Sequence, residues 1–214
     1  MKENKTQAAI IGAGHLAWSL IPTLQRAGVE VVQLISRDPA KGEQYGRQYG
    51  IPATGREVSD LSPLAHLVFL TVSDQAIAGL AQQLTRRKAG AMVVHTSGST
   101  GIDALAPLGE NAGVLYPLQS FTRDVETDLR GAPVFLEGAP QVLAVLRPLA
   151  ERLSGRVYVL DSEARLRLHL GAVMVNNFTN YLYRLAAAQL PDVPGLDFRI
   201  HQPPLPEHTE KVFR

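Results

Sequence analysis

Two glycines separated by one residue interrupt an apolar run near the start of the chain. The motif is Gly12-x-Gly14-x-x-Ala17, placed between a short apolar segment and a helical pattern. Gly12 permits a tight turn, Gly14 lets the backbone approach a pyrophosphate, and Ala17 allows close packing of helix on strand. The start of the helix also offers free N–H groups and its positive dipole end to phosphates. The motif therefore predicts a dinucleotide site, although a plain strand-to-helix turn also favours glycine.

The residues that share this turn are expected to contact the cofactor as well. Ala13 lies between the two glycines, and His15 and Leu16 begin the helical pattern. At His15 we expect the backbone to matter more than the side chain, because phosphates at this position bind to amides.

The end of the second predicted strand indicates which dinucleotide binds. An NAD site usually has an acidic residue about 20 residues after the glycines, to hold the ribose hydroxyls. Here that place is taken by Ser36 and Arg37. A hydroxyl and a guanidinium suit a 2′-phosphate, so the sequence favours NADP. The alternative is that Arg37 is only a solvated charge, and Asp38 fits the N-cap of the next helix.

The ends of the next two predicted strands should line the nicotinamide side of the cofactor. We expect Val72, Ser73 and Thr96 there, because ligands bind at the carboxyl ends of strands in such sheets. Ser73 fits equally well as a simple helix cap. The small-residue loop 97–99 is interpreted either as facing a substrate or as an ordinary turn.

Apolar strands alternate with helical patterns over the first three quarters of the chain. This alternation predicts an α/β fold of the Rossmann type, a doubly wound and mostly parallel sheet covered on both faces. Pro22 lies inside the first helical pattern, where it should remove an internal hydrogen bond. The expected strands are residues 7–12, 30–36, 66–72, 91–97, 113–121, 132–138 and 156–160, and the expected helices are 15–28, 37–50, 73–84, 102–109 and 140–155.

The character of the sequence changes at Asp161. Residues 161–190 read as one long helix, and the chain then becomes rich in proline. We expect a nucleotide-binding domain over residues 1–160 and a helical C-terminal segment over 161–214. A helix of this length at the end of a doubly wound domain usually begins a second helical domain. We therefore expect this domain to be completed by a partner subunit, or the chain to be truncated.

Three polar residues are spaced so that they share one face of that helix. His169, Asn176 and Asn180 follow an i, i+7, i+11 pattern. In a hydride-transfer enzyme, His169 is a candidate proton donor to a developing alkoxide, and Asn176 a candidate holder of the substrate oxygen. The alternative is a hydrogen-bond network between helices or subunits.

The composition limits the classes of function. The chain has 214 residues, 45% of them hydrophobic and 19% charged, with a formal charge of +1 and no cysteine. These values are typical of a globular protein and give no indication of nucleic-acid or membrane binding. The absence of cysteine excludes disulfides and thiolate metal sites, and the six histidines show no metal-ligand spacing. We expect a soluble cytoplasmic protein without a metal.

Six segments follow one another along the chain: GAGHLAWSL, SRDP, VSDQAI, VVHTSGS, YPLQSF and HLGAVMVNNFTNYLY. In this order they resemble a group of bacterial Rossmann-type proteins, predicted NADP oxidoreductases with a conserved domain of unknown function. The resemblance extends to about Tyr183 and implies kinship with pyrroline-5-carboxylate reductase, ketopantoate reductase, 6-phosphogluconate dehydrogenase and deazaflavin-dependent NADP oxidoreductases. It also implies a helical C-terminal domain that forms a homodimer. Better known relatives carry a lysine four residues before a helix asparagine, whereas here Ala172 precedes Asn176.

The sequence thus predicts an NADP-dependent oxidoreductase that acts on a C=O or C=N bond of a small metabolite by hydride transfer. An NADP-binding sensor or regulatory protein without turnover is the alternative, and a scaffold with a vestigial turn is a third hypothesis. Cofactor binding and turnover together separate the three.

Overall fold

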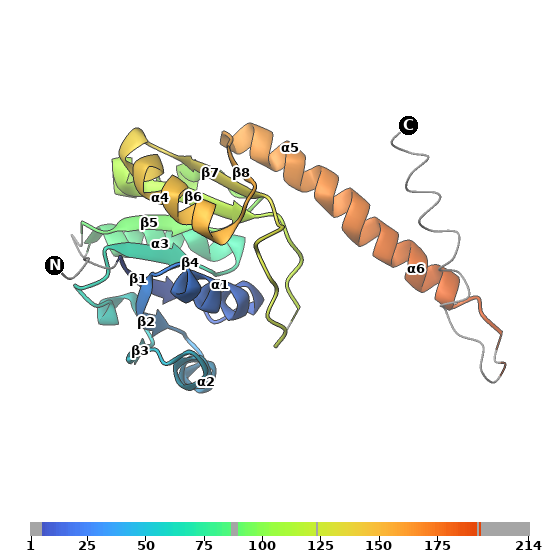
Figure 1. Cartoon of the computed structure of the whole chain (residues 1–214), viewed down its shortest axis with the longest axis horizontal. Coiled ribbons are helices and arrows are strands. Elements are labelled where there is room, and N and C mark those ends of the chain that lie inside the picture. The colour runs from blue at the N-terminus through green and yellow to red at the C-terminus, as the bar shows by residue number, and fades with distance from the viewer. Residues whose placement is uncertain (1–5, 87–89, 123, 192, 194–214) are drawn as a thin grey trace. The chain divides into compact units, whose positions relative to one another are not determined.

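The computed structural model describes residues 6–86, 90–122, 124–191 and 193 (Figure 1). Contacts within the chain divide it into two units, Met1–His169 and Leu170–Arg214, which are described separately.

The first unit contains one eight-stranded sheet with the order β3-β2-β1-β4-β5-β6-β7-β8. Neighbouring strands are parallel except for β6 and β7, which are antiparallel. The predicted α/β fold with a mostly parallel sheet is confirmed. The strands are β1 (Gln7–Ile11), β2 (Glu30–Ile35), β3 (Ala53–Gly55), β4 (Leu67–Leu70), β5 (Met92–His95), β6 (Ala112–Pro117), β7 (Val134–Gly138) and β8 (Val157–Val159).

Two features of the sheet were not expected from the sequence. β3 has three residues, of which Ala53 and Thr54 are exposed, so it leaves no apolar run to recognise. β7 runs against β6 because the described residues between them form no crossover helix, which a parallel neighbour would need.

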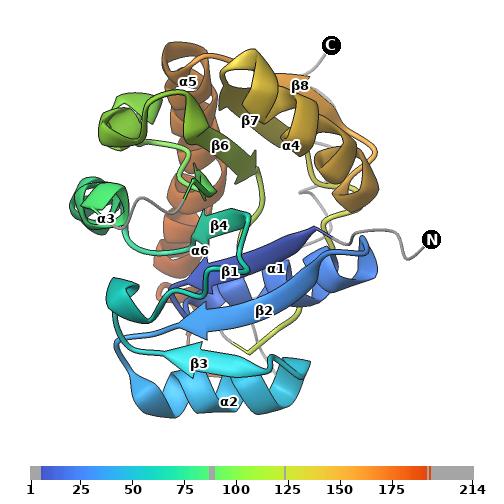
Figure 2. The same cartoon turned by 90° about the vertical axis from the view of Figure 1, so that its left-hand side faces the viewer.

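Helices cover both faces of the sheet (Figure 2). α1 and α4 pack on one face, whereas α3 and η2 pack on the other. The predicted helix at 102–109 is a 3-10 helix that contains Pro107 and is interrupted at Gly109, which has a φ of 58°. The helices of this unit are α1 (His15–Arg26), α2 (Pro39–Tyr49), η1 (Val58–Asp60), α3 (Asp74–Arg86), η2 (Ile102–Asn111), α4 (Pro140–Leu153) and the start of α5 (Ser162–Val173).

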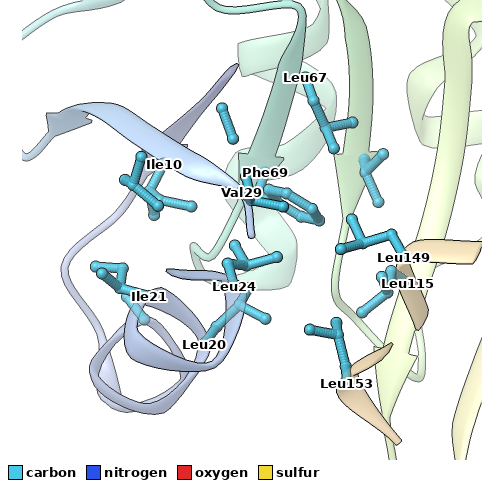
Figure 3. Close-up of a cluster of buried hydrophobic side chains, with 14 of the residues drawn as sticks. Ile10, Leu20, Ile21, Leu24, Val29, Leu67, Phe69, Leu115, Leu149 and Leu153 are labelled. Atoms are coloured by element: carbon cyan, nitrogen blue, oxygen red, sulfur yellow. The ribbon is translucent and has the colours of Figure 1, made fainter. Parts of the chain in front are cut away.

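The larger core cluster joins the sheet to α1 and α4 (Figure 3). Leu20 and Leu24 from α1 and Leu149 from α4 point toward Phe69 and Leu115 of the sheet, and all five are at most 2% exposed. Each such side chain contributes about 1.5–3 kcal/mol when it is fully buried. This packing fixes α1, and with it the glycine turn, against the sheet.

Pro22 lies within α1 without ending the helix. It has no N–H to donate to the carbonyl of Trp18, four residues earlier. The hydroxyl of Tyr49 in α2 donates to that carbonyl at 2.8 Å. A side chain from the next helix therefore replaces the hydrogen bond that the proline removes.

The second unit continues α5 through a π-helical segment, η3 (Met174–Phe178), and α6 (Thr179–Ala187). None of its described residues is buried. Six apolar side chains of this helical stretch are more than half exposed, and we call them the apolar helix residues: Leu170, Met174, Val175, Phe178, Tyr181 and Leu182. Among the helices that the structure describes, none combines the length and apolar character required to span a bilayer.

Candidate functional site

A cleft of about 920 Å³ opens at the carboxyl ends of β1, β2 and β4. Ligands of doubly wound sheets bind at this edge. Seven of the ten residues predicted to bind a cofactor line the cleft, namely Gly12, Ala13, Gly14, Ser36, Arg37, Val72 and Ser73.

The two positions of the turn differ in whether the fold requires a glycine there. Gly12 has a φ of 111°, and a Cβ there would lie 2.8 Å from the carbonyl carbon of Thr71. The fold itself therefore requires a glycine at position 12. Gly14 has an ordinary extended backbone (φ −94°, ψ −177°), and a Cβ would meet only the carbonyl oxygen of Thr71, at 3.5 Å. Nothing in the described protein excludes a side chain at Gly14, so its missing Cβ leaves space in the cleft.

Two hydroxyl groups hold this turn, one from the residue after β4 and one from α2. Thr71 Oγ1 donates to the carbonyl of Gly12 at 2.8 Å, and Tyr45 Oη donates to the carbonyl of Gly14 at 3.1 Å. Both carbonyls are thus directed into the protein. Gly14 is also the N-cap of α1, so the start of the helix lies at the cleft, and a helix N-terminus favours anions.

Four cations line the cleft: Arg37, Lys41 and Arg56, which follow β2 and β3 in the chain, and Arg86 at the end of α3. Arg37 and Arg56 follow neighbouring strands, because Ile35 pairs with Gly55 in the parallel β2–β3 ladder. Sequence reasoning missed Lys41 and Arg56. Arg56 could not be predicted because β3, which it follows, was not recognised. Lys41 could have been predicted, since it lies in α2 one helical turn after Arg37.

Two carboxylates also line the cleft, Asp38 and Glu57. Asp38 caps α2 through the amide of Lys41 at 3.3 Å, and the ammonium of Lys41 lies 3.9 Å from its carboxylate. Ser36 is buried, and its hydroxyl donates to the Asp38 carbonyl at 2.9 Å.

Three predicted cofactor residues are absent from the lining of the cleft. His15 is exposed at the first position of α1, and Leu16 packs against the core. Thr96 is 8% exposed, and its hydroxyl donates to the Leu70 carbonyl at 3.0 Å. His15 and Leu16 lie at the start of α1, and Thr96 is buried at the edge of the sheet, so none of the three lines the cleft.

A network of hydroxyl groups shapes the loop after β5. Ser97 Oγ donates to Thr100 Oγ1 at 3.1 Å and accepts from the Thr100 amide at 2.9 Å. Ser99 donates to the carboxylate of Asp74 at the start of α3. The loop 97–100 is thus an ordered turn at the carboxyl edge.

His95, at the end of β5, is fully buried. Its Nδ1 accepts the Ser97 amide at 3.2 Å, and its Nε2 has no hydrogen-bond partner among the described residues. Burial, together with the smaller effect of the positive charge of Arg165, lowers the pKa of His95 to about 4. The ring is therefore neutral at pH 7 and belongs to the interior of the sheet.

The predicted proton donor His169 contacts the ends of β5 and β6. Its Nδ1 lies 2.9 Å from Tyr116 Oη, and the two rings meet edge to face. A Cβ at Gly98 would lie 2.6 Å from His169 Nδ1 and 2.6 Å from Tyr116 Cζ. The glycine therefore lets both rings lie against the loop.

A buried ion pair anchors α5 one turn before His169. Arg165 is 1% exposed and pairs with Glu137 of β7. Its guanidinium also donates to the carbonyl of Thr100 at 2.6 Å. Arg165 therefore ties together α5, β7 and the loop after β5.

Asn176 lies in the second unit and is exposed. It donates to Asn177 at 3.2 Å and accepts from Asn180 at 3.4 Å. The expectation that His169, Asn176 and Asn180 form one stripe assumed regular α-helical spacing. The π-helical segment Met174–Phe178 changes that spacing, because a π turn contains more residues than an α turn.

Among the described residues, no group of three or more histidine, aspartate or glutamate side chains could hold a metal ion.

The fold and the cleft define a dinucleotide-binding α/β class, and comparisons give the family. Residues 1–119 match the Rossmann-like domain, and residues 132–214 match a domain of unknown function, DUF2520. The chain belongs to the family that joins these two domains.

Among solved structures, a Bacteroides fragilis protein named as a putative NADP oxidoreductase is 34% identical. The similarity covers 98% of this chain and 81% of that one, with a TM-score of 0.84. A Thermotoga maritima protein is 23% identical over 95% of this chain and 78% of its own, with a TM-score of 0.70. A prephenate dehydrogenase from A. aeolicus, in complex with hydroxyphenyl propionate and NAD+, is 15% identical over 95% and 76%, with a TM-score of 0.73. The last two similarities show the fold.

One curated relative is the oxidoreductase cns1 of Cordyceps militaris, 35% identical over 82 residues. The match covers 37% of this chain and only 10% of the length of that protein.

Proposed function

We propose that the protein is an NADP-dependent oxidoreductase that reduces or forms a C=O or C=N bond of a small metabolite. The observation that carries the proposal concerns Gly14. The packing of the protein leaves room for a side chain at this position, and yet the residue is a glycine. The space that it leaves lies at the N-terminus of α1, inside a cleft large enough for a dinucleotide. The relationship to the Bacteroides fragilis protein supports the same cofactor and reaction class.

The residues of the cleft fit the chemistry of NADP. The amides at the start of α1 suit the pyrophosphate, and Arg37, Lys41 and Arg56 suit a 2′-phosphate. An NAD site would instead offer a carboxylate to the ribose hydroxyls, and Asp38 and Glu57 are the carboxylates nearest to that role. We favour NADP because three cations outnumber them, and because Asp38 is engaged in capping α2. When bound, the nicotinamide supplies or accepts a hydride.

The protein's own groups supply the proton and orient the substrate. We propose His169 as the proton donor, since it lies at the same edge of the sheet, next to the loop after β5. For Asn176 we propose that the exposed amide holds the substrate oxygen.

We further propose that a second copy of the chain covers the apolar helix residues. Their exposure supports this, because contiguous apolar patches on a helix usually mark an interface. Sedimentation of the wild-type protein should show a dimer, and Phe178→Asp should shift it to a monomer. A wild-type monomer at micromolar concentration would contradict the proposal.

Cofactor titration tests the proposed function directly. Trp18 is the sole tryptophan and lies in the first turns of α1, edge to face with Tyr45. NADPH should quench its fluorescence with an affinity at least about tenfold tighter than that of NADH, a difference of about 1.4 kcal/mol. In a panel of ketones and imines, one class should then be reduced at the expense of NADPH, which is followed as a loss of NADPH absorbance. Binding without any turnover would favour a sensor, and a flat titration would exclude both.

A further inference from the structure

The hydrogen bond between Tyr116 and His169 lies where three elements meet. Tyr116 comes from the end of β6, His169 from α5, and Gly98 from the loop after β5. In a doubly wound sheet these strand ends lie at the carboxyl edge, beyond β4, on the side opposite the 2′-phosphate cations. The pair therefore occupies the half of the edge at which a nicotinamide and a substrate are expected.

The two nitrogens of His169 are not equivalent in this arrangement. Nδ1 lies 2.9 Å from Tyr116 Oη, and Nε2 has no hydrogen bond to a described residue. The nitrogen bonded to a fixed partner determines the tautomer and orientation of the ring. Nε2 is thus the atom left to exchange a proton with a bound molecule.

Tyr116 can serve either state of the imidazole. Burial raises the pKa of Tyr116 to about 12, so the phenol stays protonated at pH 7. Its hydroxyl can donate to Nδ1 of the neutral ring, and its oxygen can accept from Nδ1–H of the imidazolium.

The surroundings hold the pair in place. Gly98 approaches so closely that a Cβ there would overlap both rings, and Phe135 lies 6.2 Å from the Tyr116 ring centre. Four residues before His169, on the same face of α5, Arg165 is fixed by Glu137 and the Thr100 carbonyl. Preorganisation of this kind is what a proton donor needs.

We propose that Tyr116 is a positioning residue for this reaction: it binds Nδ1 of His169 and thereby reserves Nε2 for proton exchange with the substrate. This inference rests on the proposed function. In the reducing direction, the substrate carbon accepts a hydride with its electron pair from the reduced cofactor. The substrate oxygen or nitrogen takes the Nε2 proton of the imidazolium. The ring keeps its other proton at Nδ1, bonded to Tyr116, and a proton from solvent restores the acid.

Nitrogen-15 NMR of the histidine rings in the full chain tests the positioning role without turnover. His169→Gln identifies the two ring resonances of His169. In Tyr116→Phe the Nδ1 resonance should move, because it loses its hydrogen bond, and in Gly98→Ala it should move because the added Cβ separates the rings. Tyr158→Phe is the matched control, since Tyr158 stacks on the other neighbour of this cluster, Phe135, and is 46% exposed. Tyr158→Phe should leave both ring nitrogen resonances of His169 unchanged.

The same proteins are then titrated with NADPH, and their activity is assayed with the class of ketone or imine that the wild type reduces. NADPH should perturb Nε2 of His169 in the wild type. Tyr116→Phe should lower kcat about tenfold with KM changed less than twofold, as expected for the loss of one hydrogen bond. His169→Gln should lower kcat at least about a hundredfold.

An Nδ1 resonance that stays unchanged in both Tyr116→Phe and Gly98→Ala, with normal NADPH binding, overturns the role of Tyr116 alone. Unchanged kcat in Tyr116→Phe does the same. If NADPH does not bind to the wild type, the proposed function and the catalytic role of the Tyr116–His169 pair are both overturned. This outcome is distinguished from the first because NADPH binding is measured separately from the Nδ1 resonance.

Discussion

Two regions of the carboxyl edge are built in opposite ways. At the ends of β1 to β3, the cleft presents exposed cations and a bare glycine, and its residues come from short stretches of sequence. At the ends of β5 and β6, the Tyr116–His169 pair is supported by a buried ion pair from elements far apart in the chain. Exposed charge costs little stability and suits recognition of an anionic ligand, whereas buried polar groups fix positions at a high cost if a partner is lost. The exposed region is therefore suited to recognise a ligand, and the buried region is suited to hold a fixed geometry.

Removal of Arg165 should give the largest effect, in the buried region. Arg165→Met leaves Glu137 without its cation, and should lower the free energy of unfolding by about 3–5 kcal/mol. Chemical denaturation measures the change. The control is Arg167→Met, whose pair with Glu163 is exposed and should contribute less than about 1 kcal/mol. Equal effects for the two variants would remove the contrast between buried and exposed charge.

The pH dependence of stability should also originate in the buried region. The pKa of His95 is about 4 in the folded protein, below its value of about 6.5 in an unfolded chain. Between these values the unfolded chain binds a proton that the folded protein does not. Stability should therefore be constant above pH 6.5 and fall by up to about 3 kcal/mol toward pH 4. Denaturation of wild type and His95→Gln tests this, since the variant should lose the slope. His66→Gln, at an exposed histidine, should keep it.

A side chain at Gly14 should affect the cleft and spare the fold. Gly14→Val should weaken NADPH at least about a hundredfold, or about 2.7 kcal/mol, because the side chain fills the space left for phosphate. Thermal unfolding should stay close to that of the wild type, since the backbone at Gly14 is extended and its neighbours leave room. The opposite is expected for Gly12→Val, which should unfold the protein through the clash at Thr71. Normal NADPH binding by Gly14→Val would place the cofactor elsewhere.

The smallest effect should be the change of cofactor preference. Arg37→Asp should weaken NADPH by about 10–100-fold, as for the loss of a hydrogen bond between charged groups, and should weaken NADH much less. Trp18 fluorescence gives both affinities. Arg47→Asp is the control, because Arg47 is exposed on α2 outside the cleft lining. An equal loss for both cofactors would reject the 2′-phosphate assignment of Arg37.

Sequence reasoning gave most of the fold because its signals were local. Apolar runs and glycine turns are detectable in short windows, so every strand except β3, and the helices around the cleft, were placed. It failed at β3, whose residues Ala53–Gly55 contain no apolar run, and so it missed Arg56 directly after that strand. It also gave no indication that Arg165 is buried, because a charged residue on a helix is usually exposed.

By itself, the sequence determined the α/β fold and the glycine turn, since both depend on backbone freedom and on the period of apolar residues over a few positions. Only the tertiary structure distinguished Gly12, which the fold requires, from Gly14, which it does not, because that distinction depends on how closely Thr71 approaches each of them. Only the tertiary structure, likewise, joined Tyr116 to His169 across 53 positions of the chain. Contacts of that range follow from the packing of whole elements, and no local pattern of residues records them.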